Sequence, residues 1–317
     1  MTISIIIPVY NVAPYVEQCI LSVMHQTMRH GVECIIVDDC GNDDSMDRVE
    51  KLIAGYDGDI EFSILHHDHN RGLSAARNTG IDAARGQYLY FLDSDDWIVP
   101  ECMELMLGCV KKYPGVDLVQ GGIMCDRFFV GYKTSGSCLP DYISGDKLKD
   151  TFLNPINYPG TAWNKLVKSS VIKDNSLYFK ENRLHEDDLW KFMLGNHVAS
   201  ICMLKHETYC YRTRENGLTG IDKSASYSAI ASNVKECIAS INPNTPEAQI
   251  KYIMYLVYLV YNSDNDFKGL KRDIARLLPW TKGKMYFYLL LFLLMPRTLH
   301  KRMRTGNRIK RNISFIL

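Results

Sequence analysis

The sequence lacks several patterns that mark other classes of protein. None of its ten cysteines forms a Cys-x-x-Cys pair, and a chain of 317 residues can bury a core without disulfides, so we expect reduced thiols in the cytoplasm. The N-terminus has no basic segment of the kind that begins a signal peptide. No Gly-x-Gly-x-x-Gly follows the first apolar run, which argues against a dinucleotide dehydrogenase.

An excess of charge of one sign is also missing. The net charge is +1, with 37 basic and 36 acidic residues, and this ordinary globular balance predicts no nucleic-acid partner. The exception is local, because residues 297–311 contain seven Lys or Arg and no Asp or Glu.

The stretch Tyr88–Trp97 begins with five apolar or aromatic residues and continues with three carboxylates, Asp93, Asp95 and Asp96. Such a run predicts a strand buried on both faces, with the acids just past its C-terminal end. Ligands of open α/β sheets bind at that edge. Because three like charges repel one another, a hard cation such as Mg²⁺ or Mn²⁺ would stabilise them. The alternative is an acidic turn that caps the helix beginning near Pro100.

The residues before this stretch predict alternating strands and helices. We expect strands at Thr2–Val9, Glu33–Val37 and Glu61–His66, and helices at Pro14–Gln26 and Met46–Tyr56. This order implies a parallel sheet with right-handed crossovers. The second strand also runs into carboxylates, so the acids of two strands should lie at one edge, in the arrangement of a nucleotide pocket.

Two arginines accompany the next helix, expected within Asn70–Ala84. Arg71 and Arg77 lie on or beside its first turns, where backbone N–H groups also point outward, and this pairing favours an anionic ligand. The alternative is a helix with solvated arginines.

Four short motifs occur together at the N-terminus. They are Ile-Ile-Ile-Pro-Val-Tyr-Asn at 5–11, Ile-Val-Asp-Asp at 36–39, Gly-Leu-Ser-Ala-Ala-Arg-Asn at 72–78, and Phe-Leu-Asp-Ser-Asp-Asp at 91–96. In this order and spacing the chain resembles the inverting family 2 glycosyltransferases, which have the GT-A fold. The resemblance implies an α/β protein with a mixed, Rossmann-like sheet flanked by helices. The segment 40–43 departs from the family's usual Gly-Ser-Thr-Asp without removing a carboxylate.

The resemblance implies a nucleotide-sugar site. The residues that would contact the base and ribose are Pro8, Val9, Tyr10, Asp39 and Arg71. Asp38 could take the place of Asp39, Asp93 would face the ribose, and Arg77 would serve the pocket or brace it. Asp95 would coordinate the metal, Mn²⁺ or Mg²⁺.

Four residues are candidates for the donor sugar and diphosphate. They are Ser94, Trp163, Lys165 and Arg212. Trp163, two residues before Lys165, suits sugar stacking, although a buried core tryptophan is the common alternative. We expect a helix at Val167–Ile172, directly after this segment. Arg212 lies in the segment Thr208–Arg214, which we expect to begin as a strand, and the polar loop that follows at 216–224 could act as a lid.

A second acidic cluster, Glu186, Asp187 and Asp188, should begin a helix, where the helix dipole stabilises negative charge. Simple capping would explain it equally well. An inverting transfer is a single displacement that needs a general base. The family's Glu-Asp pair matches Glu186 and Asp187, which implies Asp187 as the base and Glu186 beside it on the acceptor side. Asp188 remains a rival.

The C-terminal third predicts helices at 227–241, 246–261 and 267–278, so we divide the chain into a catalytic domain, 1–225, and a helical extension, 226–317. The apolar run Met285–Met295 has eleven residues, too few to cross a bilayer, which needs about twenty. With the basic tail it predicts an interfacial anchor to anionic lipid. The alternatives are a core helix or an oligomer contact with a solvated tail.

The resemblance implies a metal-dependent inverting glycosyltransferase, and the apolar and basic C-terminus places it at the inner face of the plasma membrane. It would move a hexose or N-acetylhexosamine from a UDP-sugar to a glycan or lipid-linked acceptor, as in bacterial surface-polysaccharide synthesis. A sugar nucleotidyltransferase is a second hypothesis, but residues 8–14 lack the Gly, Arg and Lys that a triphosphate loop would need. A third is a non-catalytic binding protein of the same fold, against which Asp95 and Asp187 argue.

Overall fold

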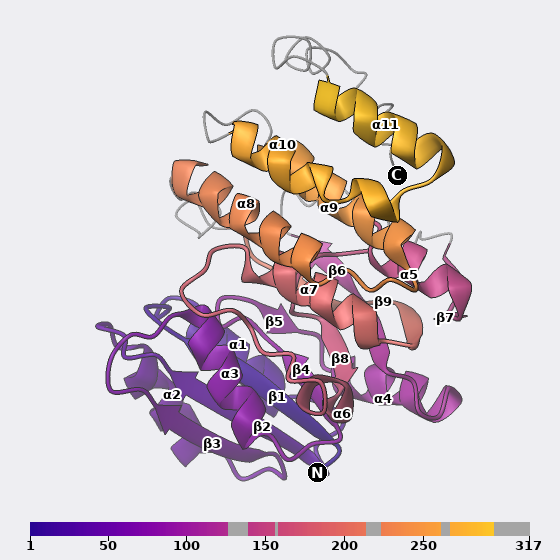
Figure 1. Ribbon diagram of the computed structural model, residues 1–317. Coiled ribbons are helices and arrows are strands. Elements are labelled where there is room, and N and C mark those ends of the chain that lie inside the picture. The colour runs from indigo at the N-terminus through magenta and orange to yellow at the C-terminus, as the bar shows by residue number, and fades with distance from the viewer. Residues whose placement is uncertain (126–138, 156–157, 214–222, 261–266, 295–317) are drawn as a thin grey trace.

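The computed structural model describes residues 1–125, 139–155, 158–213, 223–260 and 267–294, which form a mixed sheet with helices packed on it (Figure 1). Within these ranges the sheet has nine strands, in the order β3-β2-β1-β4-β8-β6-β9-β5, with β7 paired to β9. The strands are β1 Ile3–Val9, β2 Val32–Asp38, β3 Glu61–His66, β4 Tyr88–Phe91, β5 Trp97–Ile98, β6 Leu118–Cys125, β7 Tyr142–Ser144, β8 Lys165–Lys168 and β9 Ser200–Tyr211.

The N-terminal half is the predicted parallel sheet, because β1 pairs in parallel with β2 and β4, and β2 with β3. Strands β1, β2 and β4 are apolar at almost every position because both of their faces are covered, whereas β3, at the edge of the sheet, is polar and exposed at Glu61, Ser63 and His66. Ile5 and Ile7 belong to one buried cluster, and Ile6 belongs to the other. The helices that connect this half are α1 Val16–Met24, α2 Ser45–Ala54, α3 Leu73–Ala83 and α4 Cys102–Lys112, close to the predicted bounds.

The second half departs from the prediction most clearly at β8. We expected a helix over Val167–Ile172, and this was wrong for its first residues, which belong to β8. This strand pairs antiparallel with both β4 and β6, so it makes the sheet mixed. Only the short α6, Ser169–Lys173, is helical there. A four-residue strand is too short to show a period, which explains the error.

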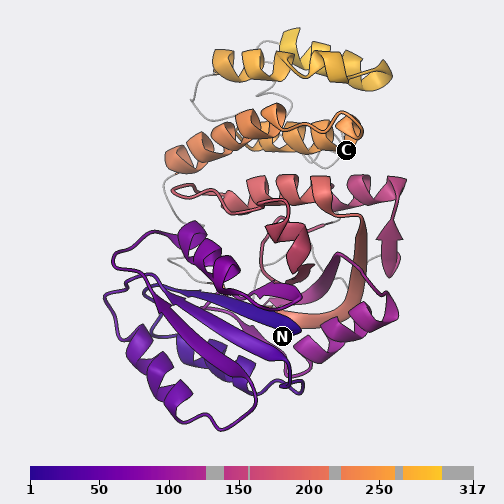
Figure 2. The same ribbon diagram turned by 60° about the horizontal axis from the view of Figure 1, so that its bottom comes forward.

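The C-terminal helices lie in layers over one face of the sheet (Figure 2). They are α5 Asp146–Phe152, α7 Glu186–His197, α8 Lys223–Ala239, α9 Pro246–Val260, α10 Phe267–Ala275, a 3₁₀ turn at Leu278–Trp280, and α11 Gly283–Leu294. One buried cluster joins Phe91 of the sheet to Trp190 of α7, Val234 of α8 and Ile253 of α9. The helical layers therefore share a core with the sheet, and the division at residue 225 stays a prediction.

The described helices include none long and apolar enough to cross a membrane. Most of the predicted lid at 216–224 and all of the basic tail at 297–311 lie outside the described residues.

Candidate active site

The candidate site lies at the sheet edge where β1, β2 and β4 end. Parallel pairing places Val9 opposite Asp38, and the Asp39 N–H donates to the Val9 carbonyl oxygen at 3.0 Å. On the other side of β1, the Leu92 N–H donates to the Ile6 carbonyl oxygen at 3.0 Å. The acids that follow β2 and β4 therefore lie at one edge of the sheet, as predicted, and flank the end of β1.

Three carboxylates come together in the turn after β4. One oxygen each from Asp93, Asp95 and Asp96 lies within 4.8 Å of the others. Burial, followed by the charges of Asp95 and Asp93, raises the pKa of Asp96 to about 8, and burial also raises the pKa of Asp93. A divalent cation would relieve this repulsion, and carboxylate oxygens suit Mg²⁺ or Mn²⁺, so these residues fit such an ion.

The end of β9 holds this acidic turn from behind. Tyr209 donates its hydroxyl to Asp96 Oδ2 at 2.7 Å and accepts from the Asp93 N–H at 3.3 Å. The Arg212 N–H donates to Asp96 Oδ1 at 2.7 Å, and its Nε donates to the Asp95 carbonyl oxygen at 3.0 Å. Arg212, predicted for the diphosphate, thus lies at the acidic turn and braces its backbone.

Arg77 joins the two acidic clusters of the site. From α3 its Nη2 reaches Asp93 Oδ1 at 2.9 Å, and its Nη1 reaches Glu186 Oε1 at 2.8 Å and Asp187 Oδ1 at 3.0 Å. The Arg77 side chain is 1% exposed and lies 5.1 Å from the Phe179 ring centroid. The sequence left open whether Arg77 contacts the ligand or braces the pocket. These contacts favour a bracing role, in which Arg77 holds the two acidic clusters together.

The second acidic cluster begins α7, where it meets the sheet. Asp187 places Oδ1 on Arg77 and accepts from the Ala162 N–H through Oδ2 at 3.1 Å. Burial and the neighbouring Asp187 raise the pKa of Glu186 to about 8, against the opposing effect of Arg77. Asp188 instead accepts from the Tyr252 hydroxyl at 3.2 Å, on the side of α9. The geometry therefore distinguishes the two acids: Asp187 shares the guanidinium of Arg77 with Asp93, whereas Asp188 contacts Tyr252 of α9.

Asp39 organises the predicted nucleotide side. Its two oxygens accept from the backbone N–H groups of Arg71 and Gly72, each at 2.8 Å, just before α3. His67 Nδ1 lies 2.7 Å from the same carboxylate, and its Nε2 lies 2.9 Å from the Thr79 hydroxyl. The loop that carries Arg71 is thereby fixed at the edge of the site.

The remaining predicted nucleotide residues differ in exposure. Tyr10 is 43% exposed, while Pro8 and Val9 are buried beneath it at the end of β1. The Asp38 side chain is 16% exposed and lies 3.0 Å from His66. Tyr10 therefore presents an accessible ring at this edge, and its contact with the base and ribose stays a prediction.

Three of the predicted donor-sugar residues are buried. Ser94 is 6% exposed, and Lys165 is 1% exposed with its ammonium donating to the Thr161 carbonyl oxygen. Trp163 stacks on the rings of Tyr209 and Tyr211, with centroids 4.4 and 5.5 Å apart. These side chains are packed inside the protein next to the site, and direct donor contacts by them stay predictions.

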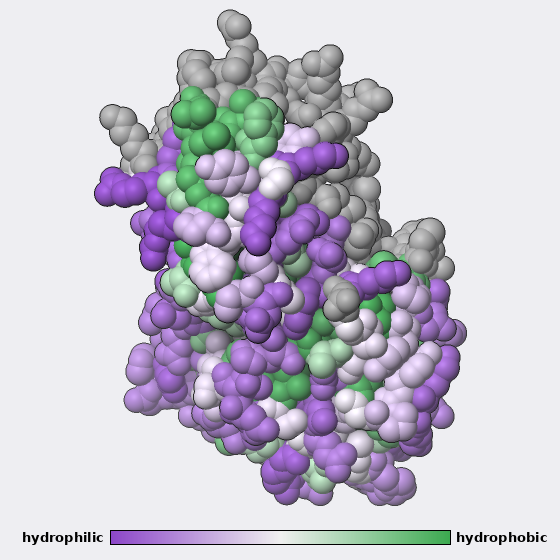
Figure 3. All heavy atoms as spheres, turned by 45° about the vertical axis from the view of Figure 1, so that its right-hand side comes forward, coloured by the Kyte–Doolittle hydropathy of each residue, from purple (hydrophilic) through white to green (hydrophobic). Residues whose placement is uncertain are grey.

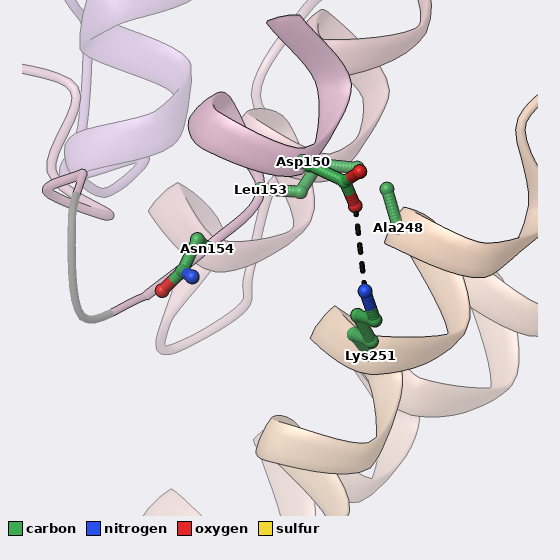
Figure 4. Close-up of a pocket in the computed structure, with 5 residues that line it drawn as sticks. All are labelled: Asp150, Leu153, Asn154, Ala248 and Lys251. Atoms are coloured by element: carbon green, nitrogen blue, oxygen red, sulfur yellow. Dashed lines mark ion pairs between the residues drawn. The ribbon is translucent and has the colours of Figure 1, made fainter. Parts of the chain in front are cut away.

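A separate hollow of about 240 Å³ lies between the C-terminal end of α5 and the start of α9 (Figure 4). Asp150 and Lys251 face each other across it at 3.6 Å, and its described lining contains none of the acidic residues of the candidate site. We therefore regard it as a gap in helix packing.

Several residues that hold the acids in place have no signal in the sequence. Tyr209, His67 and Tyr252 each hydrogen-bond a carboxylate of the site or of α7, from elements distant in the sequence. Their positions follow apolar or loop patterns that carry no chemical signal, so tertiary structure was needed to find them.

The comparisons with known proteins agree with the geometry. The model of glycosyl transferase family 2 matches residues 4–181. EpsH and EpsJ of Bacillus subtilis (strain 168), both named as glycosyltransferases, are 32% and 30% identical to this chain over 66% and 69% of its length. Those alignments span 60% and 63% of the two relatives, less than two thirds of each.

Solved structures resemble the whole architecture. The structure of S. aureus TarS 1–349 in complex with UDP covers 97% of this chain and 92% of its own, with a TM-score of 0.72 and 17% identity. The mannosyltransferase PcManGT from Pyrobaculum calidifontis, in complex with GDP-Man and Mn²⁺, covers 99% of this chain and 84% of its own, with a TM-score of 0.60 and 13% identity. At these identities the likeness establishes the fold: the mixed α/β sheet with flanking helices and the C-terminal helical layers.

Proposed function

Because the chain belongs to glycosyltransferase family 2, we propose that it is an inverting glycosyltransferase that uses a UDP-sugar donor. The observation that carries the proposal is the Arg77 bridge, since one guanidinium links the acidic turn on the donor side to Asp187 at the start of α7. UDP is the donor nucleotide we favour, because TarS, 25% identical over 68% of this chain, is named as an N-acetylglucosaminyltransferase and has been solved with UDP-GlcNAc.

In this proposal Asp187 is the general base. Its carboxylate takes the proton of the acceptor hydroxyl while that oxygen attacks C1 of the donor sugar and the bond from C1 to the diphosphate breaks, so UDP leaves with the bonding electron pair. Glu186 stands beside it on the acceptor side. A divalent cation at Asp95, with its neighbours in the turn, would supply positive charge for the diphosphate. The acceptor would be a hydroxyl of a glycan or a lipid-linked saccharide.

We propose further that the protein acts at an anionic membrane surface through α11. Apolar side chains gather at the end of the molecule where α11 lies (Figure 3), and Phe287 and Leu294 are 61% and 73% exposed. Lys282 and Lys284 flank the start of this helix, and residues 297–311 carry seven basic residues. An apolar face next to positive charge suits a membrane of anionic lipid.

Ligand-induced thermal stabilisation tests the donor site. A ligand that binds the native state raises the melting temperature by mass action. We expect UDP, but not CMP, to raise it, with a larger rise when Mn²⁺ is present. Asp95→Asn should lose the Mn²⁺-dependent part, whereas Asp57→Asn, an exposed acid between α2 and β3, should keep it. Stabilisation by GDP alone would overturn the donor class, and no response to any nucleotide would favour the non-catalytic hypothesis.

A further inference from the structure

The acidic pair at the start of α7 follows a residue with an uncommon backbone conformation. His185, immediately before Glu186, has φ of 56°, in the left-handed region. A non-glycine residue adopts this region at a cost in energy and keeps it only where the surrounding structure fixes it. The direction in which Glu186 and Asp187 leave the turn therefore depends on what holds His185.

Helix α8 holds this turn through one buried amide. Asn233 is fully buried, and its Nδ2 donates to the His185 carbonyl oxygen at 2.7 Å. Its Oδ1 accepts from Arg183 Nη1 at 3.1 Å, so the same side chain binds the chain two residues earlier. Ser226, also on α8, places its hydroxyl 2.6 Å from His185 Nε2.

Helix α9 holds the first turn of α7 from the same side. The Tyr252 hydroxyl lies 3.0 Å from the Asp188 carbonyl oxygen and 3.2 Å from its Oδ1. The Tyr252 ring is 1% exposed and lies 5.3 Å from the ammonium of Lys191, one turn further along α7. The opposite side of the same turn meets Arg77 through Glu186 and Asp187.

We infer that Asn233 and Tyr252 are positioning residues, through which the helical layer of α8 and α9 sets the direction of Glu186 and Asp187 at the sheet edge. The inference rests on the proposed function, in which Asp187 is the base. The C-terminal helices thus complete the catalytic unit. A displacement of the base by about 1 Å can cost about a hundredfold in rate.

The test compares Asn233→Ala and Tyr252→Phe with Asn196→Ala. Asn196 is the matched control, because its Nδ2 contacts the Ser240 carbonyl oxygen at 3.4 Å, just beyond α8, from the other end of α7. We expect the two positioning variants to lower kcat about tenfold or more with the KM for the UDP-sugar little changed, since donor contacts are intact. Asn196→Ala should keep kcat.

Hydrogen exchange separates this inference from the proposed function. In an α-helix the amides of residues 189–192 bond to the carbonyls of residues 185–188, so looser anchoring of that turn should speed their exchange in the ligand-free protein. We expect faster exchange there in Asn233→Ala and Tyr252→Phe and wild-type exchange in Asn196→Ala. Wild-type exchange in both positioning variants overturns the inference, even if no UDP-sugar is turned over. If Asn233→Ala does not fold, Tyr252→Phe, which keeps the ring, decides alone.

Discussion

Arg77 is the residue on which the two halves of the site converge. Its guanidinium lies within 3.0 Å of carboxylate oxygens from Asp93, Glu186 and Asp187, which are 25%, 13% and 23% exposed in their side chains. One guanidinium thus contacts three carboxyl groups at the junction of α3, the acidic turn and α7. The arrangement leaves net negative charge at the site, which a bound cation would balance.

Replacing Arg77 should therefore cost stability as well as activity. We expect Arg77→Met to lower the free energy of unfolding by about 2 kcal/mol or more, because Asp93, Glu186 and Asp187 lose the cation that they share. Partial solvent access to the three carboxyl groups keeps the loss below that of a fully buried pair. Arg77→Lys should lose less, since it keeps the charge but not the planar fork. Urea denaturation measures both.

Arg48→Met is the control for that series. Arg48 pairs with Glu17 and Asp44, but its side chain is 39% exposed, so its loss should cost under about 1 kcal/mol. An Arg77→Met protein as stable as Arg48→Met would contradict the account of Arg77 as a buried bridge.

The sequence predicted individual acids better than their partners. The motifs placed Asp39, Asp93 and Asp187 at the ends or starts of the correct elements, because strand and helix boundaries follow from the apolar pattern. Cys40, at the point where the chain departs from the family's usual glycine, has φ of 58°, a conformation that glycine favours. Which carboxylates share Arg77 depends on contacts about 110 residues apart in sequence, and no local pattern encodes these.

At the scale of elements, the parallel strands and most helices could be predicted because each is long enough to show its period. β8 could not, since it has four residues and follows Asn164 in a left-handed conformation. The twelve-residue β9 was recognised only near its end, at Thr208, although its earlier part pairs with β6 and β7. Helix α7 was predicted from its acidic start, but the two sides of that start face different partners.

Lys191 makes the stability of the α7 layer depend on pH. Burial lowers the pKa of Lys191 to about 7, and the charge of Asp188 opposes this shift. In the unfolded chain the pKa of a lysine is about 10.4. Between these values the unfolded state binds more protons than the folded state, so this group makes stability rise with pH. Glu186 and Asp96 have raised pKa values, so below about pH 8 the folded state binds more protons than the unfolded state at these two groups. Their contribution to stability therefore falls as the pH rises.

Comparing the stability of Lys191→Met with that of the wild type at several pH values isolates the contribution of Lys191. Lys191→Met keeps a side chain of similar length and removes the titration, so it should gain stability over the wild type at pH 7. We expect that advantage to shrink by about 2 kcal/mol between pH 7 and pH 9. Lys235→Met, at a lysine 62% exposed, should show no such trend in urea denaturation. An advantage that is constant with pH would mean that Lys191 keeps its charge throughout this range.

At the scale of the whole molecule, the helical layers extend the core of the sheet outward to α11. Leu289 of α11 is buried in the same cluster as the residues of α7 and α9, while Tyr286, Phe287, Leu291 and Leu294 are exposed. One side of helix α11 is thus packed against the protein, while the other side exposes apolar residues to solvent. Its outer side is the surface we assign to the membrane.

Vesicle binding tests that surface. Each exposed Phe or Leu that becomes buried contributes about 1.5 to 3 kcal/mol, so Phe287→Ser with Leu294→Ser should weaken binding to phosphatidylglycerol vesicles about tenfold or more. Phosphatidylcholine vesicles and high salt should also weaken it. Leu21→Ser, at a half-exposed leucine on α1, should bind like the wild type. Equal binding by the wild type, the double variant and Leu21→Ser would contradict the membrane assignment. The exposed side of α11 would then bind another partner, such as a second copy of the chain.

The most direct test of the central claim is UDP formation from UDP-sugars by the purified protein with Mn²⁺, with water or an added glycan as acceptor. The account predicts turnover of at least one UDP-sugar, a loss of about a hundredfold or more in Asp187→Asn, and activity close to wild type in Asp188→Asn, whose side chain faces α9. No UDP from any donor would contradict the proposed activity, and equal rates for Asp187→Asn and the wild type would contradict the assignment of the base.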